Sequence, residues 1–259
     1  MAKFTDYSRM KILGVIPARY QSTRFPGKPL AMINGKTMIR RVYEQALKSS
    51  GLTDVVIATD DQRIFSEVES FGGKVFPSKT EHLNGTTRCF EVFKHYNENN
   101  SGNYHGLINI QGDEPYIKPE QINAVANLLS DNNTEVATLA KKITHNDELL
   151  NPNIVKIVFS KTNSALYFSR SAIPFLRSAK NSEWLKHTNY HKHIGIYGFS
   201  KKSLNEFCNL KDAPIEDIEK LEQLRAIYHA KSITMVKVTS TGFGIDTKED
   251  LARAIEIFL

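Results

Sequence analysis

The sequence predicts an α/β protein with a mostly parallel central sheet flanked by helices. Three short, continuous apolar runs, over residues 12–16, 55–58 and 106–110, are typical of strands that are buried on both faces. Between them lie segments whose apolar residues recur at helical spacing. Strands that alternate with helices favour right-handed crossovers and a parallel sheet, which carries its ligand site at the carboxyl ends of the strands.

In the first half of the chain, caps and turn residues bound the expected elements. Thr37 can cap a helix that ends at Gly51, Asp61 starts the next helix, and Pro119 suits the first turn of a later one. In chain order we expect a helix over 38–50, a strand over 55–58, a helix over 62–71, a strand over 74–76, a helix over 89–96, a surface linker over 97–103, a strand over 106–110 and a helix over 119–129.

The second half changes character, because its apolar runs are separated by longer polar loops and by only one short helical stretch, near Leu149. The strands expected there are 136–140, 154–159, 165–168 and 193–199. We expect them to be mixed or antiparallel and to extend the first sheet or form an arm.

The last part of the chain returns to helices. Ser200 caps one helix, and Pro214 opens a longer one. Its expected inward residues are Ile215, Ile218, Leu221, Leu224 and Ile227. After a strand over 233–238, Thr247 caps the final helix with Asp250 three residues later.

Composition narrows the functional classes. The chain has 259 residues, enough for a full hydrophobic core, and a formal net charge of +6 that is spread without lysine or arginine blocks, so nucleic-acid binding is not indicated. Two distant cysteines, Cys89 and Cys208, fit a reducing cytoplasm better than a disulfide scaffold. No stretch approaches the roughly 20 apolar residues that span a bilayer. Residues 1–10 are polar, and we expect a short disordered leader without an export signal.

The loop after the first apolar run gathers three cations, Arg19, Arg24 and Lys28, among three prolines and Gly27. Cations held by a stiff loop beside a strand end suit an anionic ligand, most simply a polyphosphate. A solvated basic loop is the alternative. The spacing excludes a Walker P-loop, and no G-x-G-x-x-G follows a strand here.

Two aspartates, Asp113 and Asp246, each follow an expected strand. Mg²⁺ binds through few protein carboxylates together with water and substrate phosphates, so the pair and the cationic loop favour a magnesium–nucleotide site. A turn-forming or helix-capping role is the alternative for each. No zinc motif and no Ser/His/Asp arrangement is present, which favours direct transfer assisted by alignment and charge neutralisation.

Two further polar pairs stand in the second half. His193 and Tyr197 lie on one face of an expected strand, where they either line a pocket or form a hydrogen-bonded core pair. Glu222 and Gln223 lie on an expected helix, and their spacing alone favours a solvated face.

The chain closely resembles the 3-deoxy-manno-octulosonate (Kdo) cytidylyltransferases from Lys11 to its end. The opening loop reads Ile-Pro-Ala-Arg-x-x-Ser-Thr-Arg-x-Pro-Gly-Lys-Pro-Leu. The other matching motifs are Ala58-Thr59-Asp60, Gln111-Gly112-Asp113-Glu114-Pro115, Asn151-Pro152-Asn153-x-Val155-Lys156, Ala165-Leu166-Tyr167-Phe168-Ser169-Arg170, His193-Ile194-Gly195-Ile196-Tyr197, Leu221-Glu222-Gln223-Leu224-Arg225 and Gly244-Ile245-Asp246-Thr247.

The resemblance implies a nucleotide-diphospho-sugar transferase (Rossmann-like) fold and a homodimer. It implies transfer of CMP from CTP to Kdo, an acidic eight-carbon sugar, with release of pyrophosphate, which activates the sugar for lipopolysaccharide synthesis. Within a single domain over 11–259, it implies a nucleotide-binding half near 11–130 and a sugar-acid-binding and dimerisation half near 131–259. The expected reaction is attack of the sugar's anomeric 2-hydroxyl on the α-phosphorus of CTP.

The resemblance also assigns roles to individual residues. The implied nucleotide site contains Arg19, Ser22, Arg24, Lys28, Thr59, Asp60, Gly85, Thr86, Arg88 and Gln111. The implied sugar site contains Arg170, His193, Tyr197, Glu222 and Gln223, which overturns the solvated-face interpretation of the last two. The implied ligands of Mg²⁺ are Asp113 and Asp246. Together with Arg19 and Lys28 they form the implied catalytic set.

One position departs from the family pattern. The family has Ser-Gly-Thr followed by Glu or Asp and Arg, whereas this chain has Asn84-Gly85-Thr86-Thr87-Arg88. We therefore expect the contact made by the acidic residue near the nucleotide or sugar to be altered at Thr87.

Rival functions share parts of the pattern. A cytidylyltransferase for a related sugar acid, such as 8-amino-Kdo, is one alternative. An enzyme for a nonulosonate or a sugar 1-phosphate would lack the set Arg170, His193 and Glu222-Gln223. A non-catalytic polyanion-binding module would show only salt-dependent binding.

Overall fold

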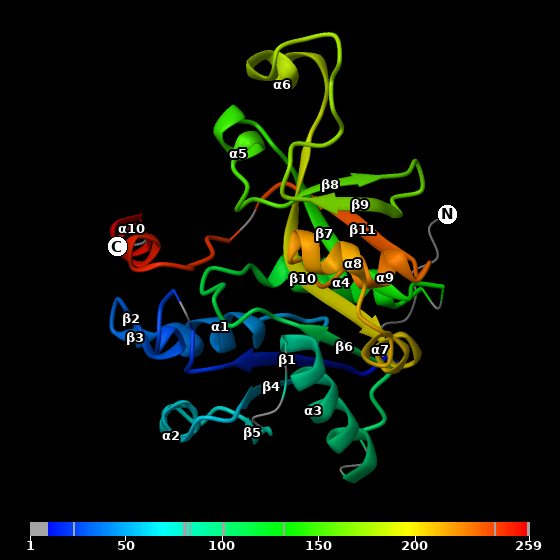
Figure 1. The fold of residues 1–259 in the computed structure, drawn as a ribbon. Coiled ribbons are helices and arrows are strands. Elements are labelled where there is room, and N and C mark those ends of the chain that lie inside the picture. Colours follow the sequence, from blue (N-terminus) through cyan, green and yellow to red (C-terminus); the bar gives the residue numbers. More distant parts are fainter. Residues whose placement is uncertain are drawn as a thin grey trace.

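The computed structural model describes residues 10–22, 24–79, 82, 84–99, 102–131, 133–240 and 242–257. Its main sheet runs in the order β11 (Ile233–Val238), β7 (Val136–Lys142), β10 (His191–Ser200), β6 (Gly106–Asn109), β1 (Ile12–Ala18), β4 (Asp54–Thr59) and β5 (Val75–Pro77). Within this path β10 pairs antiparallel with its neighbours, and the other pairs are parallel. The predicted α/β class with a mostly parallel sheet is confirmed (Figure 1).

Helices cover both faces of the sheet. Buried residues of α1 (Met38–Ala46), α2 (Gln62–Ser70) and α4 (Pro119–Leu129) pack in one core cluster. Residues of α3 (Gly85–Asn99), α7 (Lys201–Cys208) and α9 (Leu224–Tyr228) pack in the other. Because β1 contributes buried residues to both clusters, it must be apolar along its length, which is the pattern that predicted it.

Several helices begin at the predicted caps. The Asp61 carboxylate accepts a hydrogen bond from the backbone amide of Arg63 (3.0 Å) at the start of α2, and Ser200 accepts one from Ser203 at the start of α7. In α10 (Lys248–Ile257), the Asp250 amide donates to Thr247 Oγ1 (3.1 Å), and the Thr247 amide donates to Asp250 Oδ2 (3.1 Å). The predicted reciprocal cap of the final helix is confirmed.

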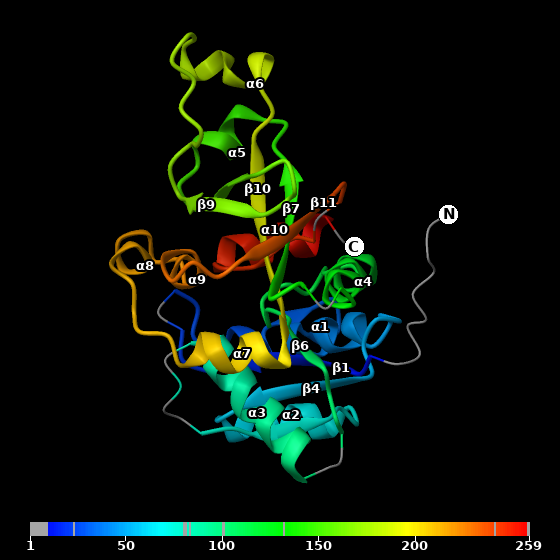
Figure 2. The ribbon, with the colours of Figure 1, turned by 90° about the vertical axis from the view of Figure 1, so that its right-hand side faces the viewer.

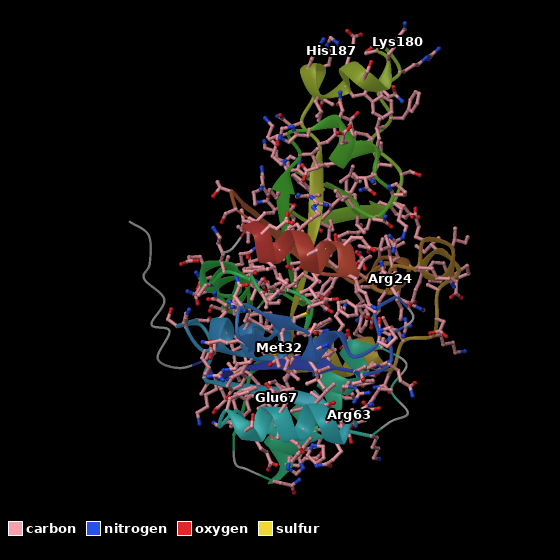
Figure 3. The ribbon with its side chains drawn as sticks, turned by 90° about the vertical axis from the view of Figure 1, so that its left-hand side faces the viewer. Arg24, Met32, Arg63, Glu67, Lys180 and His187 are labelled. Carbon is pink, nitrogen blue, oxygen red and sulfur yellow. The ribbon has the colours of Figure 1, made fainter. Side chains whose placement is uncertain are left out.

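The antiparallel arm is also present. Strand β8 (Lys156–Phe159) pairs with β10 and with β9 (Ala165–Ser169). Figure 2 shows this part of the chain, with α5 (Asn146–Leu150), standing as a separate lobe beyond the main sheet. The lobe ends in α6 (Trp184–His187), where Lys180 and His187 mark its far end in Figure 3.

Three sequence expectations about helices are wrong. The helix expected from Pro214 through Ile227 is two helices, α8 (Pro214–Glu219) and α9, separated by a left-handed Lys220 (φ 52°), and Ile218 is 80% exposed. Long-range contacts explain the break, because the Glu219 carboxylate accepts from the Ser169 hydroxyl (2.6 Å) and the Arg170 amide (2.9 Å).

The second error is the omission of α6. This helix is anchored by one buried aromatic residue, Trp184, which stacks on Tyr190 with ring centroids 5.8 Å apart. The third is the linker expected over 97–103, since α3 continues to Asn99. The expected leader lies outside the described residues except for Met10. Within the described ranges, no helix combines the length and apolar character needed to cross a bilayer.

Candidate active site

The cationic loop leaves the carboxyl end of β1 and folds back on itself. The Gly27 amide donates to the Tyr20 carbonyl (2.8 Å), and Gly27 takes a left-handed conformation (φ 71°) that favours glycine. A 3-10 turn, η2 (Lys28–Leu30), follows at once. Ser22 stiffens the loop from within, because its hydroxyl accepts from the Phe25 amide (3.3 Å). The loop therefore holds its cations in defined places.

Lys28 lies between the two predicted metal ligands. Its Nζ donates to Asp113 Oδ2 (2.7 Å) and to Asp246 Oδ1 (3.2 Å), and the guanidinium of Arg24 lies 3.2 Å from the same Asp246 oxygen. The two aspartates are 133 positions apart in the chain, yet both reach one nitrogen atom of Lys28. The structure thus brings together four predicted site residues.

Close backbone approach places Asp246 beside Asp113. The Ile245 amide donates to the Asp113 carbonyl (2.9 Å). A Cβ on Gly242 would lie 2.7 Å from the Tyr116 carbonyl oxygen, so this position needs glycine for the two loops to meet. The Gly-x-Gly spacing before Asp246 is therefore a requirement of packing.

The donor set at this point fits a hard divalent cation. Asp113 and Asp246 already share one positively charged nitrogen, and two carboxylates leave coordination positions for water and phosphate oxygens, as Mg²⁺ prefers. Among the described residues, no cluster of three or more histidine, cysteine, aspartate or glutamate side chains could hold a metal on its own. Burial, with the charges of Asp113 and Asp246, raises the pKa of the neighbouring Glu114 to about 7.

Residues of the cationic loop also line a cleft of about 850 Å³. Its lining includes Arg19, Ser22, Asp60 and Arg88, all predicted nucleotide-site residues. Arg63 also lines it, with its guanidinium stacked 3.2 Å above the Tyr20 ring centroid. Figure 3 labels Arg24 and Arg63 on the same side of the molecule.

Arg88 is fully buried in the wall of this cleft. Its Nη1 donates to the Ser78 hydroxyl and lies 3.1 Å from Asp60 Oδ1, whereas Nε and Nη2 find no hydrogen-bond partner among the described residues. Burial and the nearby Arg88 charge lower the pKa of Arg19, while Asp60 opposes this shift. Buried donors without partners are costly, so this wall suits a ligand rich in acceptor atoms.

A smaller cavity, of about 10 Å³, lies between the sheet and α9, room for about one water. Thr86, Tyr197, Glu222 and Gln223 line it, so four predicted residues from three distant segments converge there. Thr86 donates to Glu222 Oε2 (3.2 Å), while Oε1 is buried without a partner in the described part of the chain. Burial raises the pKa of Glu222 to about 7, and burial with the Glu222 charge raises that of Tyr197.

His193 stands next to Tyr197 on β10, with ring centroids 5.2 Å apart, and meets the edge of Phe168 at 5.0 Å. Burial lowers the pKa of His193 to about 3, so the ring is neutral at physiological pH. Its Nε2 lies 2.9 Å from the hydroxyl of Thr138. The two residues therefore differ, because Tyr197 lines the Glu222 cavity whereas His193 contacts the Tyr197 ring and pairs with Thr138.

Arg170 does not line the Glu222 cavity and is held by backbone carbonyls instead. Its guanidinium donates to the carbonyls of Glu219 (2.8 Å), Pro152 (3.1 Å) and Lys220 (3.5 Å). In the described residues it makes no hydrogen bond to His193 or Glu222. These contacts tie the arm to the break between α8 and α9.

Two other predicted nucleotide-site residues, Thr59 and Gly85, have local structural roles near the cleft. The Thr59 hydroxyl accepts from the Asp61 amide (3.2 Å), and its carbonyl accepts from Ser78 (2.9 Å). A Cβ on Gly85 would lie 3.2 Å from the Pro17 ring, so Gly85 lets α3 approach β1 closely.

Sequence analysis missed Asn109, which is buried at the carboxyl end of β6. Its Nδ2 donates to Thr86 Oγ1 (3.4 Å), and its Oδ1 accepts from Gln111 Nε2 (3.4 Å). Asn109 therefore joins the Gln-Gly-Asp-Glu-Pro loop to the Glu222 cavity. A polar residue within an otherwise apolar run was the available signal.

The Thr87 departure has a local explanation. The Thr87 amide donates to Asn84 Oδ1 (2.9 Å), and the Thr87 hydroxyl donates to the Asn84 carbonyl (3.2 Å). Thr87 thus occupies the third position of α3, and Asn84 precedes the helix. A serine at position 84 and an acidic residue at position 87, as in the family pattern, would form a capping box. The structure shows how Asn84 and Thr87 bond to each other at the start of α3, and the altered ligand contact at Thr87 stays a prediction.

The parallel sheet, the cationic loop and the paired aspartates at strand ends define a nucleotidyltransferase. The family model described as cytidylyltransferase matches residues 13–233. The chain belongs to this family, among its 3-deoxy-manno-octulosonate cytidylyltransferases.

Curated relatives named 3-deoxy-manno-octulosonate cytidylyltransferase include one from Parabacteroides distasonis, 45% identical over 95% of this chain and 97% of its own length. Another, from Cytophaga hutchinsonii, is 46% identical with the same coverage of both chains. Among solved structures, a CMP:2-keto-3-deoxy-manno-octonic acid synthetase complexed with CTP matches with a TM-score of 0.86 and 38% identity over 96% of this chain and 98% of its own.

Proposed function

We propose that this protein transfers CMP from CTP to Kdo, giving CMP-Kdo and pyrophosphate. The observation that carries the proposal is the contact of Lys28 with both Asp113 and Asp246, made by the same loop whose Arg19 and Ser22 line the large cleft. One loop thereby reaches a cation site and an anion site together. A triphosphate, with its associated metal, needs both.

Each part of the site then has a task. Lys28, Arg19 and Arg24 stabilise the negative charge of the departing pyrophosphate, which is the largest kind of catalytic contribution in such sites. Asp113 and Asp246 would hold Mg²⁺, which would lower the pKa of the attacking 2-hydroxyl and neutralise phosphate charge. Arg88 offers its two unpaired buried donors to acceptor atoms of the nucleotide.

The sugar acid belongs on the side of His193, Tyr197 and Glu222. Polar groups that are half-buried around a small cavity can bind hydroxyls without ionising, since Glu222 has a raised pKa and His193 a lowered one. We assign Gln223 to the same set because it lines the cavity. Arg170 would reach the substrate only by leaving its carbonyl partners.

Pyrophosphate release with each nucleoside triphosphate and a panel of sugar acids tests the proposal. Release with CTP and Kdo supports it. Release with CTP and only 8-amino-Kdo or a nonulosonate would mean that the protein is a cytidylyltransferase for that sugar acid. Absence of release with every pair, with salt-dependent binding of polyanions retained, would replace the enzyme by a binding module.

We further infer a homodimer in the cytoplasm. Large apolar side chains are exposed on the second half of the chain, among them Leu166 (57%), Phe175 (77%) and Ile218 (80%), and such surface is favourable to cover. The free thiols of Cys89 and Cys208 suit a reducing compartment. Sedimentation equilibrium tests the first inference, and cell fractionation tests the second.

A further inference from the structure

The hydroxyl of Thr138 sits at an irregularity between β7 and β10. Thr138 is fully buried, and its Oγ1 lies 2.8 Å from the Ile196 carbonyl oxygen, 3.3 Å from that of Ile194 and 2.9 Å from His193 Nε2. The register of the two strands shifts between Ile194 and Gly198, which brings both carbonyls to one side chain. Three polar atoms therefore compete for one hydroxyl group.

Counting protons decides how they share it. A hydroxyl has one proton to donate and lone pairs to accept with, whereas a carbonyl oxygen only accepts. The Thr138 proton therefore goes to a carbonyl, and the shorter distance selects Ile196. A lone pair of Oγ1 remains for His193, which must then donate from Nε2.

The other tautomer does not satisfy the same atoms. With the ring proton on Nδ1, the bare Nε2 would need the Thr138 proton, and the buried Ile196 carbonyl would face a hydroxyl with no proton left to donate. The ring carries only one proton at neutral pH, because burial lowers its pKa to about 3. Protonation of Nε2 thus leaves Nδ1 as a lone-pair acceptor, and the described residues offer that atom no hydrogen bond.

We propose that Thr138 is a positioning residue that holds His193 in the Nε2–H tautomer, so that Nδ1 accepts a hydrogen bond from a hydroxyl of the sugar substrate. The ring has little freedom to flip, since it packs on the edge of Phe168 and beside Tyr197. Tyr197 borders the cavity of Glu222, which sets His193 among the sugar-site residues. The role of Nδ1 rests on the proposed function, whereas the tautomer does not.

Long-range ¹H–¹⁵N NMR of histidine-labelled protein reads the tautomer directly, with the His193 signals identified by their loss in His193→Gln. We expect a protonated Nε2 in the native protein and in Thr138→Ser, which keeps the hydroxyl. Thr138→Val keeps the shape but removes the hydroxyl, and we expect a mixture of tautomers. A protonated Nδ1 in the native protein, or an unchanged tautomer in Thr138→Val, would overturn the proposal.

Steady-state kinetics test the consequence. A neutral hydrogen bond contributes modestly, so we expect Thr138→Val to raise KM for the sugar acid about 3- to 10-fold while KM for CTP stays unchanged. Thr138→Ser should restore the native value. Equal changes in both KM values would mean that Thr138 acts only through the fold. If the enzyme used another sugar, the NMR result would stand and only the substrate in this assay would change.

Discussion

Replacing Lys28 with methionine should have opposite effects on metal binding and on turnover. Methionine keeps much of the apolar stem but removes the ammonium that donates to Asp113 and Asp246. The two carboxylates then lose their common counter-charge and become a better site for a divalent cation. The departing pyrophosphate is then no longer stabilised by the positive charge of this ammonium.

The size of the metal effect follows from the contacts. Hydrogen bonds to charged groups contribute about 1.5–3 kcal/mol. The carboxyl side chains are 34% and 49% exposed, so solvent screening reduces the competition to about 1–2 kcal/mol, or roughly 5- to 30-fold in affinity. Turnover should fall by about 10²–10³, as when a positioned donor to developing negative charge is lost.

Binding of Mn²⁺ to the nucleotide-free protein, followed by electron paramagnetic resonance, measures the first effect. Lys28→Arg, which keeps a cation, should bind Mn²⁺ like the native protein. Lys186→Met removes a lysine that is 72% exposed on α6 and serves as the matched control. Unchanged or weaker Mn²⁺ binding in Lys28→Met would refute competition between the ammonium and a metal for these aspartates.

Three other changes test separate parts of the site. Asp113→Asn should lower kcat by at least about 100-fold with CTP and Kdo; a loss of less than tenfold, near 1.4 kcal/mol in the barrier, would exclude a metal-holding role. The Glu222 carboxyl keeps its proton in the folded protein up to a pKa of about 7, whereas an ordinary carboxyl, as in the unfolded chain, loses its proton near 4.5. The contribution of Glu222 to the stability of the folded protein therefore declines as the pH rises from 4.5 to 7. Urea unfolding should therefore show native protein losing about 2 kcal/mol relative to Glu222→Gln between pH 5 and 7.5, and a constant difference would contradict the burial of this carboxyl. Asn84→Ala should destabilise the protein by about 1 kcal/mol through loss of the α3 cap, while Thr87→Glu should leave both melting temperature and kcat near native values; a large loss of activity in Thr87→Glu would show that this position meets the substrate.

Local patterns were sufficient for much of the fold. The buried runs that became β1, β4 and β6 are apolar because both faces of the sheet are covered, and that requirement acts within each strand. Pairs such as Thr247 and Asp250 act within one turn of helix. The rule that parallel strands carry ligands at their carboxyl ends was enough to place Asp113 near the cationic loop.

Features that depend on distant contacts escaped prediction. The pattern after Pro214 is helical throughout, but contacts of Glu219 with Ser169 and Arg170 end α8 at that residue. No local signal marks such a contact, because its partners lie 50 and 49 positions away. Asn109 and Thr138 were missed for the same reason, since each looks like a polar interruption of a strand until the atoms it meets are known.

The cations and carboxylates around the cationic loop form two unequal groups. In the cleft wall, three arginines, Arg19, Arg63 and Arg88, stand beside two carboxylates, Asp60 and Asp61, which leaves an excess of positive charge, and two donor atoms of Arg88 have no partner among the described residues. Around Lys28 the balance reverses, because Asp113, Asp246 and Glu114 outnumber Lys28 and Arg24, and burial together with the two aspartate charges raises the pKa of Glu114. A ligand that carries anionic phosphates together with a divalent cation relieves both imbalances at once, whereas a polyanion alone would relieve only the first. The charge distribution therefore favours a metal–nucleotide substrate over simple polyanion binding.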